Sequence, residues 1–89
     1  MKHSALPAFW KRYNALPETV RKIADKNFRL LKENPSHPSL QFKKMVTSSG
    51  RKLWSVRVGS DYRAVGLDKL NEISWFWIGS HSEYDRVIS

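Results

Sequence analysis

Three segments with alternating apolar and polar residues, separated by short turns, dominate the second half of this sequence. They are Leu53–Val58, Tyr62–Leu67 and Ile73–Gly79, with turns at residues 59–61 and around residues 68–72. Alternation with a period of two is typical of half-buried β-strands, and turns of this length connect antiparallel neighbours. The segments therefore predict an antiparallel meander.

A shorter and strongly basic segment, Gln41–Val46, precedes the turn Thr47–Gly50 and predicts one more strand. The last strand carries bulky apolar groups on both faces, which favours a central position in the sheet. We expect Ile73, Trp75 and Trp77 on one of its faces and Ser74, Phe76 and Ile78 on the other. With Trp54, the tryptophans of the strands are interpreted as core residues.

The first half of the chain predicts two helices. Aromatic residues spaced by three and four indicate a short helix over Pro7–Asn14, and a longer apolar pattern indicates a second helix from Pro17 to about Asn34. Pro17 suits a first helical position, and Pro35 disfavours helix at the residue before it. The expected fold class is α+β, with a two-helix hairpin packed on one face of a three- to four-stranded antiparallel sheet, and the other face open. Residues 83–88 predict one further helical turn.

The length of 89 residues predicts a single domain spanning residues 1–89. Cysteine is absent, so neither a disulfide framework nor a thiolate metal site is expected, which fits a reducing compartment. His3 and His37 have no neighbours at ligand spacing and are interpreted as incidental. No metal and no cofactor are therefore expected.

The segment after Met1 does not resemble a signal peptide, and the longest strongly apolar run is Trp75–Ile78. These features predict a cytoplasmic protein without a membrane span. The formal net charge of +8 requires an anionic partner. Nucleic acid is the first candidate, because basic residues that neutralise phosphates release counterions. A membrane surface is less favoured, since the basic residues do not line one face of a helix, whereas an acidic protein partner stays open.

Three stretches of the sequence resemble the RelE/ParE toxins of bacterial toxin–antitoxin pairs. They read LWSVRV at residues 53–58, YRAV at residues 62–65 and WIGSHSEYDRV at residues 77–87. The resemblance extends over nearly the whole chain. It implies a RelE-like, microbial-RNase-like fold, a role as the toxin of a type II toxin–antitoxin system, and an acidic antitoxin as partner.

The resemblance also implies a set of site residues. Arg63 matches the arginine on the third strand of the mRNA-cleaving members, His81 matches a residue that helps to transfer the proton, and Tyr84 lies near the aromatic residue of others. Phosphate-contacting residues are expected at Lys43, Lys44, Arg51 and Arg57. Because adjacent residues of a strand point to opposite faces, we expect only one of the two lysines to matter.

These residue types are suited to RNA cleavage, because RNA supplies its own nucleophile, the 2′-hydroxyl. The protein then needs a group that exchanges a proton near neutral pH and cations that offset the charge growing on the phosphate, but no metal. His81 and Arg63 suit these tasks. The favoured interpretation is a ribosome-associated endoribonuclease acting on mRNA. The alternative is a ParE-like DNA gyrase poison or a non-catalytic basic binding domain, in which His81 and Arg63 are ordinary surface residues.

Overall fold

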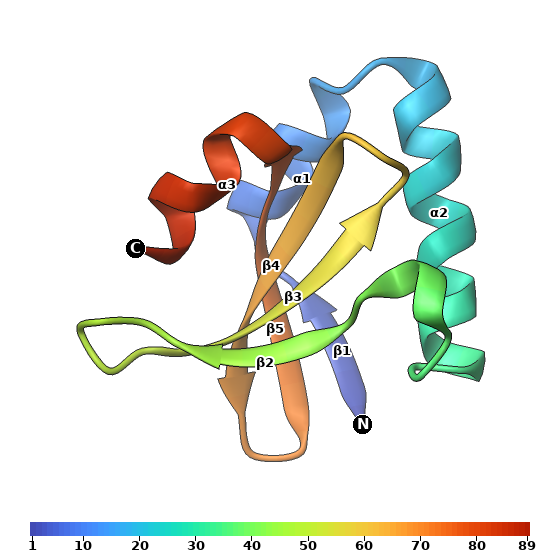
Figure 1. The fold of residues 1–89 in the computed structure, drawn as a ribbon. Coiled ribbons are helices and arrows are strands. Elements are labelled where there is room, and N and C mark those ends of the chain that lie inside the picture. The colour runs from blue at the N-terminus through green and yellow to red at the C-terminus, as the bar shows by residue number, and fades with distance from the viewer.

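The computed structural model describes residues 1–89 and has an α+β architecture built on a five-stranded sheet (Figure 1). The elements follow the chain in the order β1 (Lys2–Ala5), α1 (Pro7–Asn14), α2 (Glu18–Glu33), a 3₁₀-helix (Pro38–Leu40), β2 (Lys43–Val46), β3 (Lys52–Val58), β4 (Tyr62–Lys69), β5 (Glu72–Ser80) and α3 (His81–Ile88). The expected α+β class, the two N-terminal helices and the meander β2–β5 are confirmed.

The number of strands differs from the expectation of three to four antiparallel strands. The spatial order is β1-β5-β4-β3-β2, and β1 pairs with β5 in parallel, from Lys2↔Glu72 to Ala5↔Trp75. The sheet is therefore mixed. The sequence did not indicate β1 because its four residues have no apolar alternation, and their hydrogen-bond partners lie at the far end of the chain.

A β-bulge in β5 corrects the expected assignment of its faces. Val65 pairs with Trp77 and Gly66 pairs with Trp75, so Phe76 has no partner in β4. An unpaired residue inverts the alternation beyond it. Trp75 and Trp77 consequently lie on opposite faces of the sheet, and the prediction that they share a face is wrong.

The two faces carry separate hydrophobic clusters. The face toward α1 and α2 packs around Leu16, Leu31, Leu40, Val56, Val58, Ala64, Ile73, Trp75 and Ile78. On the other face Leu53, Val65 and Trp77 contact Tyr84 of α3. This second face was expected to be open, but the helical tail is longer than one turn and covers part of it.

An aromatic cluster within α1 carries the hydrogen bond that joins it to α2. Phe9, Trp10 and Tyr13 of α1 contact one another, and the Tyr13 hydroxyl donates a hydrogen bond of 2.6 Å to Asp25 of α2. This bond raises the pKa of Tyr13 above its ordinary value of 10.0. None of the helices is long and apolar enough to cross a membrane.

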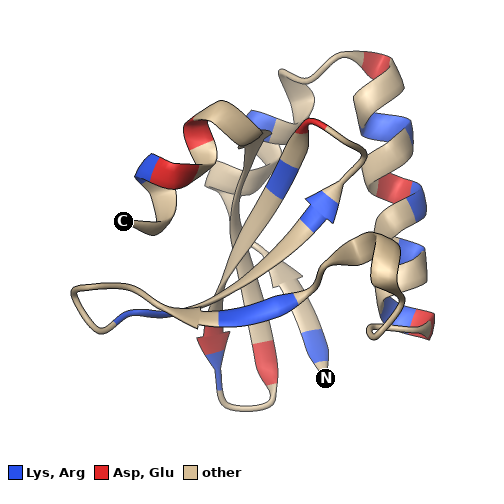
Figure 2. Ribbon diagram, viewed as in Figure 1, with Lys and Arg blue, Asp and Glu red and all other residues tan.

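Basic residues are distributed over both layers of the fold. Figure 2 shows Lys and Arg on strands β2, β3 and β4 as well as along α2. Only two ion pairs form, Lys22–Glu18 within α2 and Lys44–Asp68 between β2 and β4. Most of the positive charge is therefore available to anionic ligands.

Candidate active site

Strand register places two arginines side by side. Arg57 of β3 pairs with Arg63 of β4, and both follow the alternation of Leu53 and Val65, so they lie on the face that carries α3. Like charges at directly paired positions repel each other. No carboxylate lies within ion-pair distance of either guanidinium. The pair is therefore an uncompensated cationic site on the sheet.

Arg63 is held by contacts with three residues from two segments, α3 and the residue after the 3₁₀-helix. Its Nε donates to Nδ1 of His81 at 3.3 Å, and its Nη2 donates to Oε1 of Gln41 at 2.9 Å. The guanidinium carbon lies 5.1 Å from the centroid of the Tyr84 ring, a distance typical of cation–π contact. The third nitrogen, Nη1, is buried without a hydrogen-bond partner. Arg63 is thus fixed in place by the protein, with one buried donor left unpaired.

Arg57 is anchored differently, through the turn that follows β3. Its Nε donates to the carbonyl oxygen of Gly59 at 2.8 Å, and its own carbonyl accepts a bond of 3.2 Å from Asn27 of α2. Gly59 has φ +61°, a conformation that glycine adopts without steric cost. The turn therefore holds the Arg57 side chain in place on the face that it shares with Arg63.

His81 is the first residue of α3 and is exposed beside Arg63. Its backbone N–H donates to the carbonyl of Asp61 at 2.7 Å, which ties the start of the helix to the β3–β4 turn. Since Nδ1 accepts the bond from Arg63, the neutral imidazole carries its proton on Nε2, and Nε2 has no partner within the chain. An unpartnered ring N–H next to the Arg63 guanidinium is suited to donate a proton at a phosphate.

Tyr84 packs against both His81 and Arg63. Its ring is stacked against His81 with a centroid distance of 5.9 Å, and only 4% of the residue is exposed. The hydroxyl points to the sulfur of Met45 at 3.7 Å. Positions i and i+3 of a helix share a side, so Tyr84 and His81 act as one unit. Because Tyr84 is buried and its hydroxyl points into the core, its ring is placed to position His81 and Arg63.

The structure separates the two adjacent lysines of β2. Lys43 pairs with Ser55 and follows the face of Met45, so it lies on the arginine-bearing side. Lys44 lies on the opposite side, where its Nζ is 3.2 Å from Asp68 and 5.9 Å from the centroid of the Trp54 ring. Trp54 Nε1 also donates a hydrogen bond to Asp68 at 2.8 Å. The pKa of Asp68 is lowered mainly by this bond and next by the contact with Lys44.

Arg51 is not brought into the cluster. It follows Gly50 in the β2–β3 turn, where its backbone N–H donates to Oγ1 of Thr47 and its guanidinium lies 5.6 Å from the Phe76 ring centroid. Of the seven residues expected at the site, the structure brings Arg63, His81 and Tyr84 into contact and pairs Arg57 with Arg63 in the sheet. Lys43 lies on the same face, Arg51 lies on that face beside Phe76 and away from the cluster, and Lys44 lies on the opposite face.

Gln41 belongs to the cluster and was not anticipated as a site residue. It follows the 3₁₀-helix with φ 44° and ψ 43°, a left-handed conformation that is uncommon for a residue other than glycine. This conformation directs its amide to Arg63. No sequence pattern marks the position, because the contact joins residues 22 positions apart.

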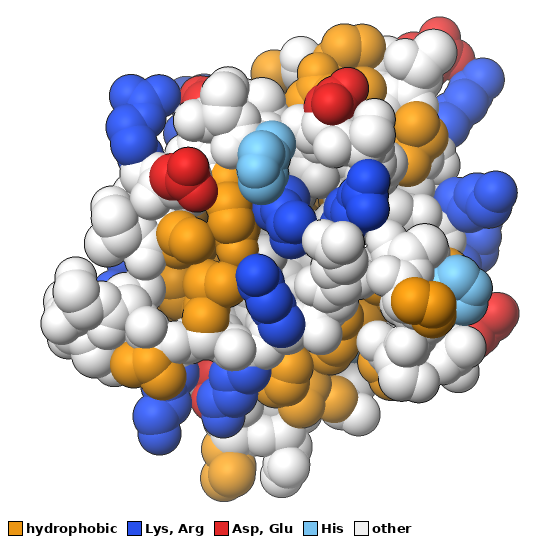
Figure 3. Space-filling view, in the orientation of Figure 1, with side chains coloured by type: hydrophobic (Ala, Val, Ile, Leu, Met, Phe, Trp, Pro, Cys, Tyr) orange, Lys and Arg blue, Asp and Glu red, His pale blue; other side chains and the backbone are white.

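Basic, histidine and hydrophobic side chains lie close together on the face that carries α3. In Figure 3 a histidine lies beside Lys and Arg side chains in the middle of the face, with hydrophobic side chains next to them. No group of three or more His, Asp or Glu side chains is arranged to hold a metal ion. The cluster defined by Arg57, Arg63, His81, Tyr84 and Gln41 is called the arginine–histidine site below.

The fold that carries this site is the fold of small toxins. A chain of the archaeal RelE–RelB complex from Pyrococcus horikoshii superposes with a TM-score of 0.66 at 16% identity, over 89% of this chain and 92% of that chain. The YoeB/ParE toxin from Agrobacterium tumefaciens gives 0.66 at 15% identity, over 91% and 99% of the two chains. A copper-bound mutant toxin from Helicobacter pylori gives 0.65 at 21% identity, over 93% and 97%.

The family follows from the sequence itself. The model of the ParE-like toxin domain matches residues 18–86, from the start of α2 into α3, and the chain therefore belongs to this family. No curated protein sequence matches the chain. The family match includes all five residues of the arginine–histidine site.

Proposed function

We propose that this protein is the toxin of a type II toxin–antitoxin pair and that it cleaves mRNA at the ribosome without a metal. The observation that carries the proposal is the bond between Arg63 and His81 beside a second arginine, with no carboxylate to neutralise them. A cationic surface with one unpartnered imidazole nitrogen matches the needs of a single phosphodiester.

The proposed reaction uses the 2′-hydroxyl of the RNA as nucleophile. A bond forms from the 2′-oxygen to phosphorus while the bond from phosphorus to the 5′-oxygen breaks, leaving a 2′,3′-cyclic phosphate and a 5′-hydroxyl. The 2′-hydroxyl loses its proton to solvent, and the leaving 5′-oxygen gains the proton that Nε2 of His81 carries; the imidazole takes a proton back from water to complete the turnover. Arg57 and Arg63 bind the phosphoryl oxygens through charge-assisted hydrogen bonds.

The partners follow from charge. A net charge of +8 favours docking on RNA, including ribosomal RNA, and favours an acidic antitoxin that covers the basic face. The RelE–RelB complex offers a precedent for a two-chain assembly on this fold. A cytoplasmic location agrees with both partners.

The family match favours one second candidate, a ParE-like poison of DNA gyrase. In that function the basic face binds a protein or DNA surface, and no proton transfer at His81 is needed. Because only the nuclease needs proton transfer at His81, substitution of His81 separates the two candidates.

The test is inducible expression of the wild-type chain, His81→Gln and Arg63→Lys, with growth measured and the ends of cellular mRNA mapped. The proposal expects growth arrest with new 5′-hydroxyl ends for the wild type, and loss of both in each variant. His37→Gln is the matched control, because His37 bonds only to Ser39 outside the site. Arrest that persists in His81→Gln, with intact mRNA and gyrase-linked DNA breaks, would establish the second candidate instead.

A further inference from the structure

A cavity lies between the helical hairpin and the sheet, on the face opposite the arginine–histidine site. Its volume is about 240 Å³, and 12 of its 16 lining residues are hydrophobic. Val56, Val58 and Ala64 form its floor on β3 and β4, and they alternate with Arg57 and Arg63 on the other face. The cavity is therefore separated from the proposed catalytic face by the thickness of the sheet.

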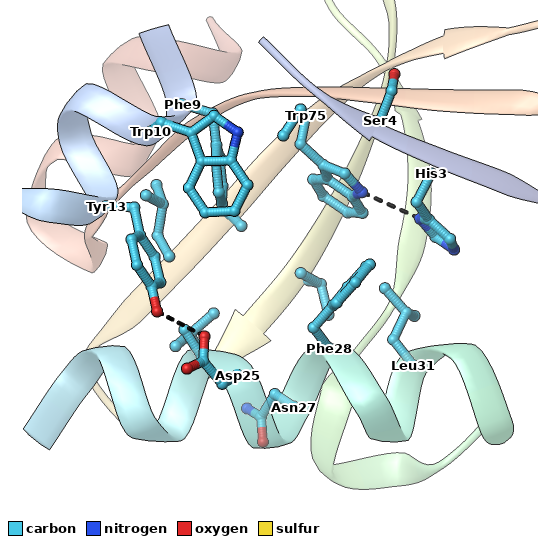
Figure 4. Close-up of a pocket in the computed structure, with 16 residues that line it drawn as sticks. His3, Ser4, Phe9, Trp10, Tyr13, Asp25, Asn27, Phe28, Leu31 and Trp75 are labelled. Carbon is cyan, nitrogen blue, oxygen red and sulfur yellow. Dashed lines mark hydrogen bonds between the residues drawn. The ribbon is translucent and has the colours of Figure 1, made fainter. Parts of the chain in front are cut away.

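The walls of the cavity are mainly aromatic. Figure 4 shows Phe9, Trp10 and Tyr13 of α1 on one side of the space and Trp75 with His3 on another, while Phe28 of α2 projects between the layers. Trp10 is 49% exposed and Phe28 is 39% exposed, so both reach the mouth. Aromatic rings prefer edge-to-face or offset partners with centroids 4.5–7 Å apart, and an opening between such walls suits a flat ring.

The polar groups around the cavity are already satisfied by the protein. Trp75 Nε1 donates to Nδ1 of His3 at 3.1 Å, and the Tyr13 hydroxyl donates to Asp25, as the dashed lines in Figure 4 mark. Ser4 donates to Glu72 in the same way. Burial, the N-terminal ammonium and Lys32 lower the pKa of His3, which keeps the imidazole neutral. A ligand therefore meets apolar surface and finds no buried charge to pair with.

We propose that this cavity is a binding site for a small, flat, uncharged aromatic molecule of one or two rings. An apolar cavity of about 150 Å³ is large enough to bind benzene, so the larger space here accommodates a bicyclic ring. A charged ligand would lose its hydration without gaining a partner. The site is independent of the proposed nuclease function, because none of its lining residues belongs to the arginine–histidine site.

The four tryptophans provide an internal control for a binding experiment with indole as the probe. Trp10 and Trp75 line the cavity, whereas Trp54 packs against Phe42 and Trp77 lies in the cluster under α3. Indole titrated into ¹⁵N-labelled protein should shift the side-chain N–H signals of Trp10 and Trp75 saturably, and leave those of Trp54 and Trp77 in place. Uniform shifts, or shifts that do not saturate, overturn the proposal.

The second test fills the cavity with a larger side chain. Ala24 of α2 lines the space, and Ala24→Met should fill part of it and weaken indole binding by about tenfold or more. Ala8→Met in α1 is the matched control, because Ala8 is exposed and outside the cavity. In the wild type, indole at ten times its Kd should raise the Tm by about 5–10 °C. Equal binding by both variants, or no rise in Tm for the wild type, contradicts the site.

Discussion

Nε of Arg63 donates a hydrogen bond to Nδ1 of His81 across 3.3 Å, although the residues are 18 positions apart and belong to β4 and α3. A guanidinium nitrogen can only donate, so Nδ1 must accept this bond, and the contact fixes which imidazole nitrogen faces outward. Tyr84 lies beneath both side chains. The orientation of the histidine therefore depends on an arginine that no carboxylate neutralises.

The residue at position 41 should affect how well Arg63, paired with His81, binds phosphate. Gln41→Glu keeps an acceptor oxygen for Nη2 of Arg63 but adds a negative charge, which would compete with phosphate; we expect RNA cleavage to fall by about tenfold or more. Gln41→Ala removes only the positional support and should lower cleavage less. Cleavage rates on ribosome-bound mRNA, with circular dichroism to confirm folding, measure the difference. Equal activity of wild type and Gln41→Glu would show that RNA does not contact Arg63.

Lys43 and Lys44 are a natural pair of matched substitutions. Lys43→Ala removes a cation from the proposed RNA face and should reduce the dependence of binding on salt by about 0.7 in log–log slope, the value for one contact with single-stranded RNA. Lys44→Ala should leave RNA binding unchanged and slightly lower stability, because Lys44 faces Asp68 on the other side. Fluorescence titrations with a short RNA at several salt concentrations measure both. A larger effect from Lys44 would contradict the orientation of β2.

His3 should make stability depend on pH. Its pKa is lowered in the folded state from the ordinary 6.5, so below about pH 6.5 the unfolded chain takes up a proton that the folded chain resists. Stability should be greatest above this pH and fall as the pH drops toward the folded pKa. Protonation of Nδ1 would also break the bond from Trp75.

The check for His3 is the Tm of the wild type and His3→Gln between pH 8 and pH 5. The variant should lose less stability over this interval than the wild type. Lys32→Gln should also reduce the loss, because Lys32 contributes to lowering the pKa of His3. Parallel curves for the wild type and His3→Gln would exclude His3 as the titrating group.

Gly66 should be intolerant of a side chain. A Cβ at this position would lie 2.4 Å from Cγ2 of Ile73 and 3.0 Å from Cε3 of Trp75, opposite the bulge. We expect Gly66→Ala to cost about 1–3 kcal/mol, as overpacking does. Gly50→Ala meets open space and should cost only the strain of its positive φ, about 1 kcal/mol. Urea unfolding measures both, and a Gly66→Ala protein as stable as the wild type would contradict the bulge.

The sequence predicted those elements whose signals are local. Pro7–Asn14 forms the expected helix, and each hairpin strand lies within one or two residues of its expected bounds. Strand β1 and the bulge at Phe76 were missed, because both depend on distant partners and leave no periodic trace. The prediction that Trp75 and Trp77 share a face was wrong for the same reason.

The proximity of Arg63 and His81 was predicted from strand order, since a residue at the end of one strand lies near the start of its hairpin neighbour. Gln41 was missed because its role comes from a left-handed backbone conformation and not from a pattern. His3 was interpreted as incidental, but the structure packs it against Trp75 and Phe28. Side-chain identity alone did not distinguish these positions.

The parallel pairing of β1 with β5 has a consequence for synthesis. Ser4 donates a hydrogen bond to Glu72, a residue 68 positions later, so an early-translated segment has no strand partner until most of the sheet has been made. Contacts this distant slow folding. While translation proceeds, the apolar sides of α1 and α2 lack the strands that cover them, and exposed apolar surface of this kind favours aggregation.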